Sequence, residues 1–307
     1  MSTACRCAPC PKRMQLLWEL FWETTVLREK AGERLSPRAQ REEVRTMVRV
    51  VITGACGKMG RAILNLALED GDLDVAGLVE MKGHPMAGKA HDLMSGKPPL
   101  VVDDPAEAIS GADVVIDFSE AAASVSHFKT AVEKGVAHVI GTTGLKDDDL
   151  RFIRETKGAR VVVSPNMSIG MNILFDLAQR VSAIMGDAYD AEIVELHHHW
   201  KKDAPSGSAL KIKDAVEAGQ KGRDWIEVFG REGMTGERKK DEIGIMSIRG
   251  GDIVGEHTLF FAGIGERLEL THRAWSRDNF ARGALLAAKW LVNQPQGIYS
   301  MKDVLGL

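Results

Sequence analysis

The sequence predicts an α/β protein in which a doubly wound parallel sheet is followed by a second, α+β part. Two observations support this prediction. From residue 48 onward, short runs of β-branched residues alternate with stretches of helical apolar period, which is the pattern of βαβ units. After Ser168 this alternation stops, and strand-like runs joined by glycine-containing turns follow. The 307 residues, of which 44% are apolar, are enough to bury the cores of two domains.

The first half of the chain contains the elements of the parallel sheet. The run VRVVIT at 48–53 predicts a buried strand, because it consists almost entirely of apolar β-branched residues. The elements expected after it are a helix at 58–69, strands at 73–79 and 114–118, a helix at 121–134, and strands at 137–140 and 160–163.

The second half predicts a different arrangement. The elements expected there are a helix at 172–185, a strand at 191–196, a helix opened by Ser206 and Gly207, and strands at 243–249, 257–262 and 267–272. Tight turns containing glycine separate the last three strands, which predicts an antiparallel sheet. The apolar period of 279–291 predicts a helix that packs back on the first sheet.

Residues 1–46 differ in composition from the rest of the chain. They hold nine Lys or Arg against six Asp or Glu, whereas the whole chain has a net charge of −3. An amphipathic helix is expected at 15–29, and the remainder has no apolar period. We interpret Met47 as a natural translation start and residues 1–46 as a poorly ordered extension. An organelle-targeting peptide is the alternative, and the six acidic residues argue against it.

Cysteine usage and charge limit the classes of partner. Cys5, Cys7 and Cys10 have the spacing of half a metal site, but no second Cys or His pair lies near them, so no metal is predicted. Cys56 is the one cysteine after them, which favours the reducing cytoplasm. Interspersed charges argue against a nucleic-acid partner, and no apolar run is long enough to cross a membrane. The expected partner is a small molecule.

The loop between the first strand and the first helix reads GACGKMGR at 54–61. Its glycines allow a tight turn and the close approach of a pyrophosphate to the N-terminus of the helix. Glu80 follows the second strand, 20 residues after Gly60, where an acid can bind the adenosine ribose. Together they predict a Rossmann-type dinucleotide-binding domain. The alternative is a turn in which the glycines serve only the backbone geometry.

Three further features of the nucleotide-binding half are open to two interpretations. Cys56 stands where the commoner G-x-G-x-x-G pattern has glycine, and we interpret it as a small packing residue, with a reactive thiol as the alternative. The loops at 141–144 and 164–167 each follow the carboxyl end of a strand, so both are expected to border the nicotinamide. Either loop taken alone could be an ordinary turn.

The stretch ELHHHWKKDAPSGS at 195–208 concentrates more polar chemistry than any other part of the chain. Its three consecutive histidines cannot all bind one metal, because successive side chains point in different directions. Ser206 opens a helix whose free N–H groups and hydroxyls would bind a carboxylate, with Lys201 and His198 close by. Simple N-capping by Ser206 is compatible with that role.

With these motifs in place, the chain from 48 to 307 resembles the dihydrodipicolinate reductase family of diaminopimelate and lysine biosynthesis. The E-x-HH-x-x-K-x-DAPSG string at 195–207 is the most specific part of the resemblance. The other motifs, in order, are GACGKMGR, IDFS at 116–119, GTTG at 141–144, SPNMSIGMN at 164–172, REGMTGE from Arg231, GDIVGEHT from Gly251 and GERLELTHRAWSR from Gly265.

The resemblance implies an enzyme that transfers a hydride from NAD(P)H to a cyclic dicarboxylate and yields tetrahydrodipicolinate. It implies that His197 donates a proton and that Lys201 assists. The positions implied to hold the substrate carboxylates are His198, Ser206, Gly207 and Ser208. The positions implied to bind the cofactor are Gly54, Ala55, Cys56, Gly57, Lys58, Met59 and Glu80 at its adenosine half, and Gly141, Thr142, Thr143, Ser164, Pro165, Asn166 and Met167 at its nicotinamide.

Three residues depart from the family pattern. Ser208 stands where threonine is usual and keeps the hydroxyl, and Cys56 replaces a usual glycine. Met81 occupies the position where many members carry an arginine for the NADP phosphate. Since Glu80 would repel that phosphate, NADH is expected to be modestly preferred over NADPH.

The resemblance also implies domain boundaries and a homotetramer. The dinucleotide-binding domain is expected at 47–168 and 278–307, and a substrate-binding and tetramerisation domain at 169–277. Two other functions fit the first domain equally well. They are a different NAD-dependent dehydrogenase of the same two-domain type and a non-catalytic protein that senses nicotinamide cofactors.

Overall fold

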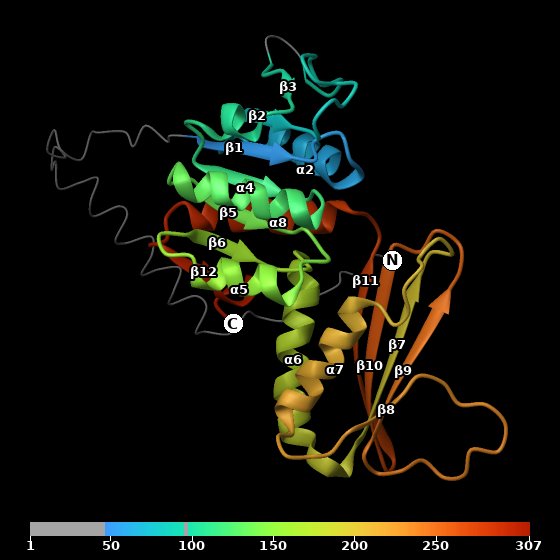
Figure 1. Cartoon of the computed structure of the whole chain (residues 1–307). Coiled ribbons are helices and arrows are strands. Elements are labelled where there is room, and N and C mark those ends of the chain that lie inside the picture. The colour runs from blue at the N-terminus through green and yellow to red at the C-terminus, as the bar shows by residue number, and fades with distance from the viewer. Residues whose placement is uncertain (1–46, 95–97) are drawn as a thin grey trace, which may run out of the picture. The chain divides into compact units, whose positions relative to one another are not determined.

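A computed structural model describes residues 47–94 and 98–307, which belong to a compact unit over Met47–Leu307 (Figure 1). The predicted helix at 15–29 and Cys5, Cys7 and Cys10 lie outside the described residues. None of the helices within the described ranges is long and apolar enough to cross a membrane.

A seven-stranded parallel sheet forms from the first half of the chain and one strand near the C-terminus. Its strand order is β12-β6-β5-β4-β1-β2-β3. The strands are β1 Val48–Thr53, β2 Leu73–Val79, β3 Val101–Val102, β4 Val114–Asp117, β5 Ala137–Ile140, β6 Arg160–Val163 and β12 Gly297–Tyr299. The α/β fold class and its doubly wound parallel sheet are thereby confirmed.

Helices cover both faces of this sheet because its strands are apolar on both sides. Val50 and Ile52 pack in the core with helices α2 (Lys58–Glu69) and α8 (Asp278–Leu291), so the C-terminal helix returns to the first sheet as predicted. Val51, which points the other way in a strand, packs in a separate core. The helices on that side are α3 Pro105–Ile109, α4 Ala121–Glu133 and α5 Asp147–Glu155.

The order of the strands fixes where a ligand can bind. β1 lies between β2 and β4, and the chain runs outward from β1 in both directions across the sheet. The loops after β1 and β4 therefore diverge at the carboxyl edge of the strands and leave a crevice between them. The glycine-rich loop follows β1 at this switch point, and Phe118 and Ser119 follow β4.

The second sheet is mixed, so the prediction of an antiparallel sheet is wrong in part. Its order is β11-β10-β7-β9-β8. β9 pairs in parallel with both of its neighbours, β7 and β8. The strands are β7 Asp190–His197, β8 Ile226–Val228, β9 Glu242–Arg249, β10 Gly255–Gly263 and β11 Glu266–Ala274. The chain passes through helix α7 (Gly207–Gly219) and β8 between β7 and β9, and parallel neighbouring strands need a long crossover of this kind.

The turn at 250–254 explains the error. It does not fold β10 back against β9 but crosses the end of β7. Gly250 N–H donates to the carbonyl of His197 at 2.9 Å, and His198 N–H donates to the carbonyl of Ile253 at 2.7 Å. Only the turn at 263–266 joins two neighbouring antiparallel strands, β10 and β11. The crossing turn packs directly on the histidine run.

One face of the second sheet packs against helices α6 (Ile169–Met185) and α7 (Figure 1). Ile193 of β7, Ile245 of β9 and Phe261 of β10 fill the core between them. α6 begins before the predicted residue 172 because Ser168 caps it, accepting a hydrogen bond from Met171 N–H at 3.2 Å.

The elements that the sequence did not predict are short or polar. They are β3, β8, β12, α3, α5 and α9 (Met301–Leu305). Strands of two or three residues and helices of five residues show no period that could be recognised.

Candidate active site

The glycine-rich loop has a backbone that needs its glycines. Gly54 has a φ of +65°, where side chains are strained, and its N–H donates to the carbonyl of Val79 at 2.9 Å. A Cβ on Gly60 would lie 2.1 Å from the carbonyl oxygen of Gly54, so the first turn of α2 can pack here only without a side chain. Gly57 is the N-cap of α2 and offers no side-chain cap. The first N–H groups of that helix are therefore open to an anion.

A cavity of about 450 Å³ lies at this helix end. It is lined by Gly54, Cys56, Gly57, Val79, Glu80, Met81, His84, Phe118, Ser119, Glu120, Ala123 and His127. The loops after β1, β2 and β4 thus meet in one site, as the switch point requires. Ala55 is buried below the loop, whereas Lys58 is exposed and Met59 is half-buried.

Glu80 supports the glycine-rich loop as well as facing the cavity. One carboxylate oxygen, Oε1, accepts a hydrogen bond from Cys56 N–H at 2.7 Å, and the other, Oε2, accepts from Met81 N–H at 3.2 Å. Burial raises the pKa of the Cys56 thiol, and the negative charge of Glu80 raises it further. This direction favours the packing role of Cys56 over the reactive thiol.

The GTTG segment borders a buried carboxylate. Thr142 donates to Asp117 Oδ1 at 3.1 Å, and a Cβ on Gly141 would lie 2.3 Å from the ring of Phe118. Burial would raise the pKa of Asp117, but the hydrogen bond from His127 at 2.8 Å and the proximity of His138 hold that pKa well below its usual range. Thr143 is exposed at the end of β5.

The SPNM loop follows β6 of the first sheet, and a hydrogen bond links it to helix α7. Ser164 donates to the carbonyl of Asn166 at 2.8 Å, and Asn166 Nδ2 donates to Ser208 Oγ at 3.0 Å. Pro165 is exposed, whereas the side chain of Met167 is 1% exposed and packs in the core of the first sheet. This loop therefore brings the expected nicotinamide end of the site beside the expected carboxylate site.

His197 lies at the end of β7 in a network with two charged residues. Its Nδ1 is 2.5 Å from Glu195 Oε2, and Arg249 contacts both oxygens of the same carboxylate at 2.9 and 2.8 Å. Glu195 is fully buried. Burial would raise its pKa, but the hydrogen bonds from His197 and Arg249 outweigh burial and lower the pKa strongly. Glu195 is therefore an anion that orients the imidazole.

Ser206 is held from both sides at the start of α7. Its N–H donates to Glu195 Oε1 at 3.1 Å, and its hydroxyl accepts from Ala209 N–H at 3.2 Å. The hydroxyl also lies 3.0 Å from His257 Nε2. Burial, and then the charge of His197, lower the pKa of His257 to about 3, so this imidazole is neutral where it meets the Ser206 hydroxyl.

The other groups of the site remain more accessible. Gly207 is exposed and Ser208 is half-buried, and their N–H groups open α7, where a helix provides no internal acceptors. Lys201 Nζ lies 2.9 Å from each carboxylate oxygen of Asp203. Burial, and then the charge of His197, lower the pKa of His198. The predicted residues from 197 to 208 are thus brought together around one helix end.

Sequence reasoning missed three residues of this site, which are Glu195, Arg249 and His257. Glu195 was part of the motif but was given no role. Arg249 comes directly before the GDIVGEHT motif, and His257 lies within it.

Comparisons with known proteins agree with this geometry. The family model described as "Dihydrodipicolinate reductase, N-terminus" matches residues 48–167, and "Dihydrodipicolinate reductase, C-terminus" matches residues 170–305. The chain is 49% identical to the 4-hydroxy-tetrahydrodipicolinate reductase of Syntrophus aciditrophicus, over 85% of this chain and 99% of that protein. It is 50% identical to the reductase of the same name from Anaeromyxobacter sp. strain Fw109-5, over 85% of this chain and 98% of that one.

A solved structure shares the fold. The dipicolinate-bound dihydrodipicolinate reductase of Paenisporosarcina sp. TG-14 superposes with a TM-score of 0.68 at 23% identity, covering 84% of this chain and 99% of that chain. Both halves of the chain match the family's models, and the relatives match over nearly their whole length. The chain belongs to the dihydrodipicolinate reductase family.

Proposed function

We propose that this chain reduces 4-hydroxy-tetrahydrodipicolinate to tetrahydrodipicolinate with NAD(P)H as the hydride source. As a member of its family it is an NAD(P)H-dependent oxidoreductase. The observation that carries the proposal is the hydrogen-bonded group of His197, Glu195 and Arg249 beside the open N-terminus of α7. This arrangement supports the assignment of a proton donor next to a site for carboxylates.

The cavity at the switch point fits a dinucleotide. Gly54 and Gly60 leave the backbone free of side chains where a pyrophosphate would approach, and Glu80 faces the same cavity. The bound cofactor would supply the hydride. We assign its adenosine half to the loop at 54–59 with Glu80, and its nicotinamide end to the segments at 141–143 and 164–167.

The substrate carboxylates are assigned to the residues around the start of α7. The N–H groups of Gly207 and Ser208 point out of the helix end, where the helix dipole favours an anion. His198 directly follows the last residue of β7 and completes the assigned set. Ser206 is assigned to the same set as the residue that holds the start of α7 in place, since its N–H and hydroxyl are engaged with Glu195 and His257.

Proton transfer is assigned to His197, with assistance from Lys201. Because His197 Nδ1 is bound to Glu195, the ring presents Nε2 for transfer to the substrate. A Cβ at residue 255 would lie 3.0 Å from that Nε2, so the ring fits here because residue 255 is glycine.

An assay of NADH oxidation distinguishes the proposed reductase from the two alternatives, a different dehydrogenase and a non-catalytic sensor. A reductase oxidises NADH only when the enzymatically generated cyclic dicarboxylate is supplied. A different dehydrogenase would be inactive with that substrate but active with another, and a sensor would bind NADH without turnover. Lack of turnover with the dicarboxylate would contradict the proposal.

We expect NADH to be preferred over NADPH by about tenfold or less in kcat/KM, equivalent to about 1.4 kcal/mol. Glu80 would accept from a ribose hydroxyl but repel a 2′-phosphate, and the side chain of Met81 is 72% exposed and carries no charge. Arg61, one cation that could reach the phosphate, is engaged with Asp92 at 2.7 and 2.9 Å. Lys58 and Lys82 are exposed, so they limit the preference without abolishing it.

Initial rates with each cofactor at low ionic strength test this expectation. Met81→Arg should raise kcat/KM for NADPH, because arginine can pair with the phosphate in a bidentate way. Met81→Leu is the matched control and should leave the ratio of the two cofactors unchanged. If the wild-type enzyme prefers NADPH by tenfold, the attraction of the nearby lysines for the 2′-phosphate outweighs its repulsion by Glu80, and the expectation is wrong.

We also propose that the protein is a cytoplasmic homotetramer assembled through its second sheet. Only one face of that sheet packs against α6 and α7 among the described residues. Val194, Leu196 and Phe260 alternate with the core positions and are half-buried outside that core. A second copy of the chain would cover these apolar side chains.

A chain that begins at Met47 is expected to keep its activity within about twofold and to remain a tetramer. The strands, the glycine-rich loop and every assigned site residue lie after residue 46, and residues 47–307 have their own cores. Steady-state rates and sedimentation equilibrium would measure both properties beside the full-length chain. Loss of the fold or of the tetramer would show that residues 1–46 contribute to them.

A further inference from the structure

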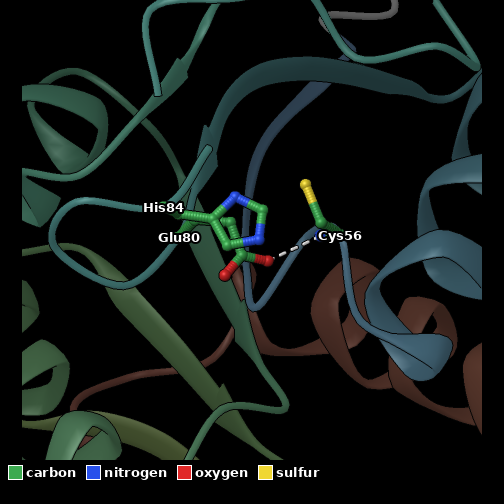
Figure 2. A group of neighbouring side chains, drawn as sticks. All are labelled: Cys56, Glu80 and His84. Atoms are coloured by element: carbon green, nitrogen blue, oxygen red, sulfur yellow. Dashed lines mark hydrogen bonds between the residues drawn. The ribbon is translucent and has the colours of Figure 1, made fainter. Parts of the chain in front are cut away.

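Three side chains of types that bind transition metals lie close together (Figure 2), and all three line the cavity beside the glycine-rich loop. They are Cys56 of the glycine-rich loop, Glu80 at the end of β2 and His84 of the following turn. Their ligand atoms, one from each residue, all lie within 4.8 Å of one another. Among the described residues this is the one such group of three His, Cys, Asp or Glu side chains.

The spacing is close to that of a tetrahedral zinc site. Zinc binds sulfur at about 2.3 Å, nitrogen at about 2.0 Å and carboxylate oxygen at about 2.0 Å, so its ligands are separated by roughly 3.5 Å. The three side chains are half-buried, so each can rotate and bring its ligand atom to the shorter separation that zinc requires. Thiolate, imidazole and carboxylate together form a ligand set that suits zinc.

The surroundings of the cluster already orient two of its ligands. The N–H groups of Cys56 and Met81 donate to the two oxygens of Glu80, and each oxygen keeps a further lone pair for a metal. Such contacts fix a ligating carboxylate. His84 Nδ1 accepts from Met86 N–H at 3.2 Å. Coordination through Nε2 would move the ring proton to Nδ1 and break that long hydrogen bond.

We propose that Cys56, Glu80 and His84 form a Zn²⁺ site that excludes the cofactor. The thiol releases its proton to water when the metal binds, and water or buffer completes the four ligands. The metal would occupy the place beside Glu80 that the adenosine ribose needs. The site itself does not depend on the proposed function; only the competition with the cofactor rests on it.

The site depends on the thiol of Cys56. Cys56 stands in the loop at a position where a glycine would provide no ligand, and without the thiolate only a carboxylate and an imidazole remain. This proposal therefore departs from the prediction of no metal, which was based on Cys5, Cys7, Cys10 and the histidine run and did not consider His84.

Cobalt binding to the full-length chain tests the site directly. The starting variant carries serine in place of Cys5, Cys7 and Cys10, so that any sulfur-to-cobalt charge-transfer band in the near ultraviolet reports Cys56. We expect one equivalent of Co²⁺ to produce this band, and Zn²⁺ to displace it. Adding Cys56→Ser should abolish the band.

Zinc affinity measured against a chromophoric chelator tests the other ligands. Adding His84→Ala to the starting variant should weaken Zn²⁺ binding by at least about 100-fold, since loss of even a supporting contact can cost 10- to 100-fold. His199→Ala is the matched control, because it removes an exposed histidine from the run at 197–199 and should leave the affinity unchanged. A band that persists without Cys56, or an affinity that His84→Ala does not change, would overturn the site.

Competition is measured in the same cobalt-loaded protein. Saturating NADH should remove the thiolate band, whereas the dicarboxylate substrate alone should not. These readouts need no turnover, so they remain interpretable if the proposed reaction is wrong. A cobalt band that NADH leaves intact would overturn the exclusion of the cofactor.

Discussion

His197→Gln is expected to lower kcat by about 10²- to 10⁴-fold, the usual contribution of a positioned general acid. The imidazole is held at the end of β7 by its 2.5 Å hydrogen bond to Glu195, so its free nitrogen can deliver a proton in a fixed direction. Glutamine fills a similar volume and still forms hydrogen bonds, but its amide cannot act as an acid at neutral pH. The loss should therefore fall on the chemical step.

Lys201→Ala is expected to reduce kcat within the same range, because Lys201 is the residue proposed to assist protonation. The side chain of Lys201 is 19% exposed and lies 2.9 Å from the carboxylate of Asp203, which limits its motion. His199→Ala and Lys202→Ala are matched controls, since both residues are exposed neighbours of the same chemical type.

Steady-state rates and NADH binding together distinguish catalysis from folding. Fluorescence titration should give an unchanged NADH Kd for His197→Gln and Lys201→Ala, because the nucleotide cavity is lined by other residues. The two control variants should keep wild-type kcat. Turnover within about twofold of wild type in both test variants, far below a general-acid contribution, would refute the assignment.

The parallel sheet was predictable because its strands carry their signal locally. The runs at Val48–Thr53 and Leu73–Val79 begin and end at the predicted residues, since each is a short, largely apolar stretch that is followed at once by glycine or an acid. The start of α7 was predictable for a similar reason. Pro205, Ser206 and Gly207 mark a helix N-terminus on their own, whatever the rest of the chain does.

The network behind His197 was not predictable, because it depends on strand pairing. Glu195 and His197 share a face of β7, and the parallel register places His197 opposite Arg249 of β9. The sequence suggested that β9 would pair with β10 instead, which would have put Arg249 elsewhere. The cluster of Cys56, Glu80 and His84 was hidden similarly, since a turn brings His84 back to the glycine-rich loop.

Glu195→Gln is expected to reduce both catalysis and stability, because one buried carboxylate holds three elements of the site. It binds His197 of β7, Arg249 of β9 and the N–H of Ser206 that opens α7. Breaking a buried ion pair costs about 3–5 kcal/mol, and since the Arg249 side chain is 21% exposed and can be rehydrated, we expect a loss of about 2–3 kcal/mol of unfolding free energy.

Stability alone would not show that Glu195 positions the proton donor, so kcat measured beside the NADH Kd is the deciding comparison. Glutamine offers no anion to orient the imidazole of His197, so Glu195→Gln should lower kcat by about tenfold or more and leave the NADH Kd unchanged. Glu192→Gln is the matched control. Glu192 lies on the same strand and pairs with Arg231 at 3.0 and 2.8 Å, away from His197. It should cost stability while kcat stays within about twofold of wild type. If both variants destabilise the protein and neither lowers kcat further than that, Glu195 supports the fold and does not position His197.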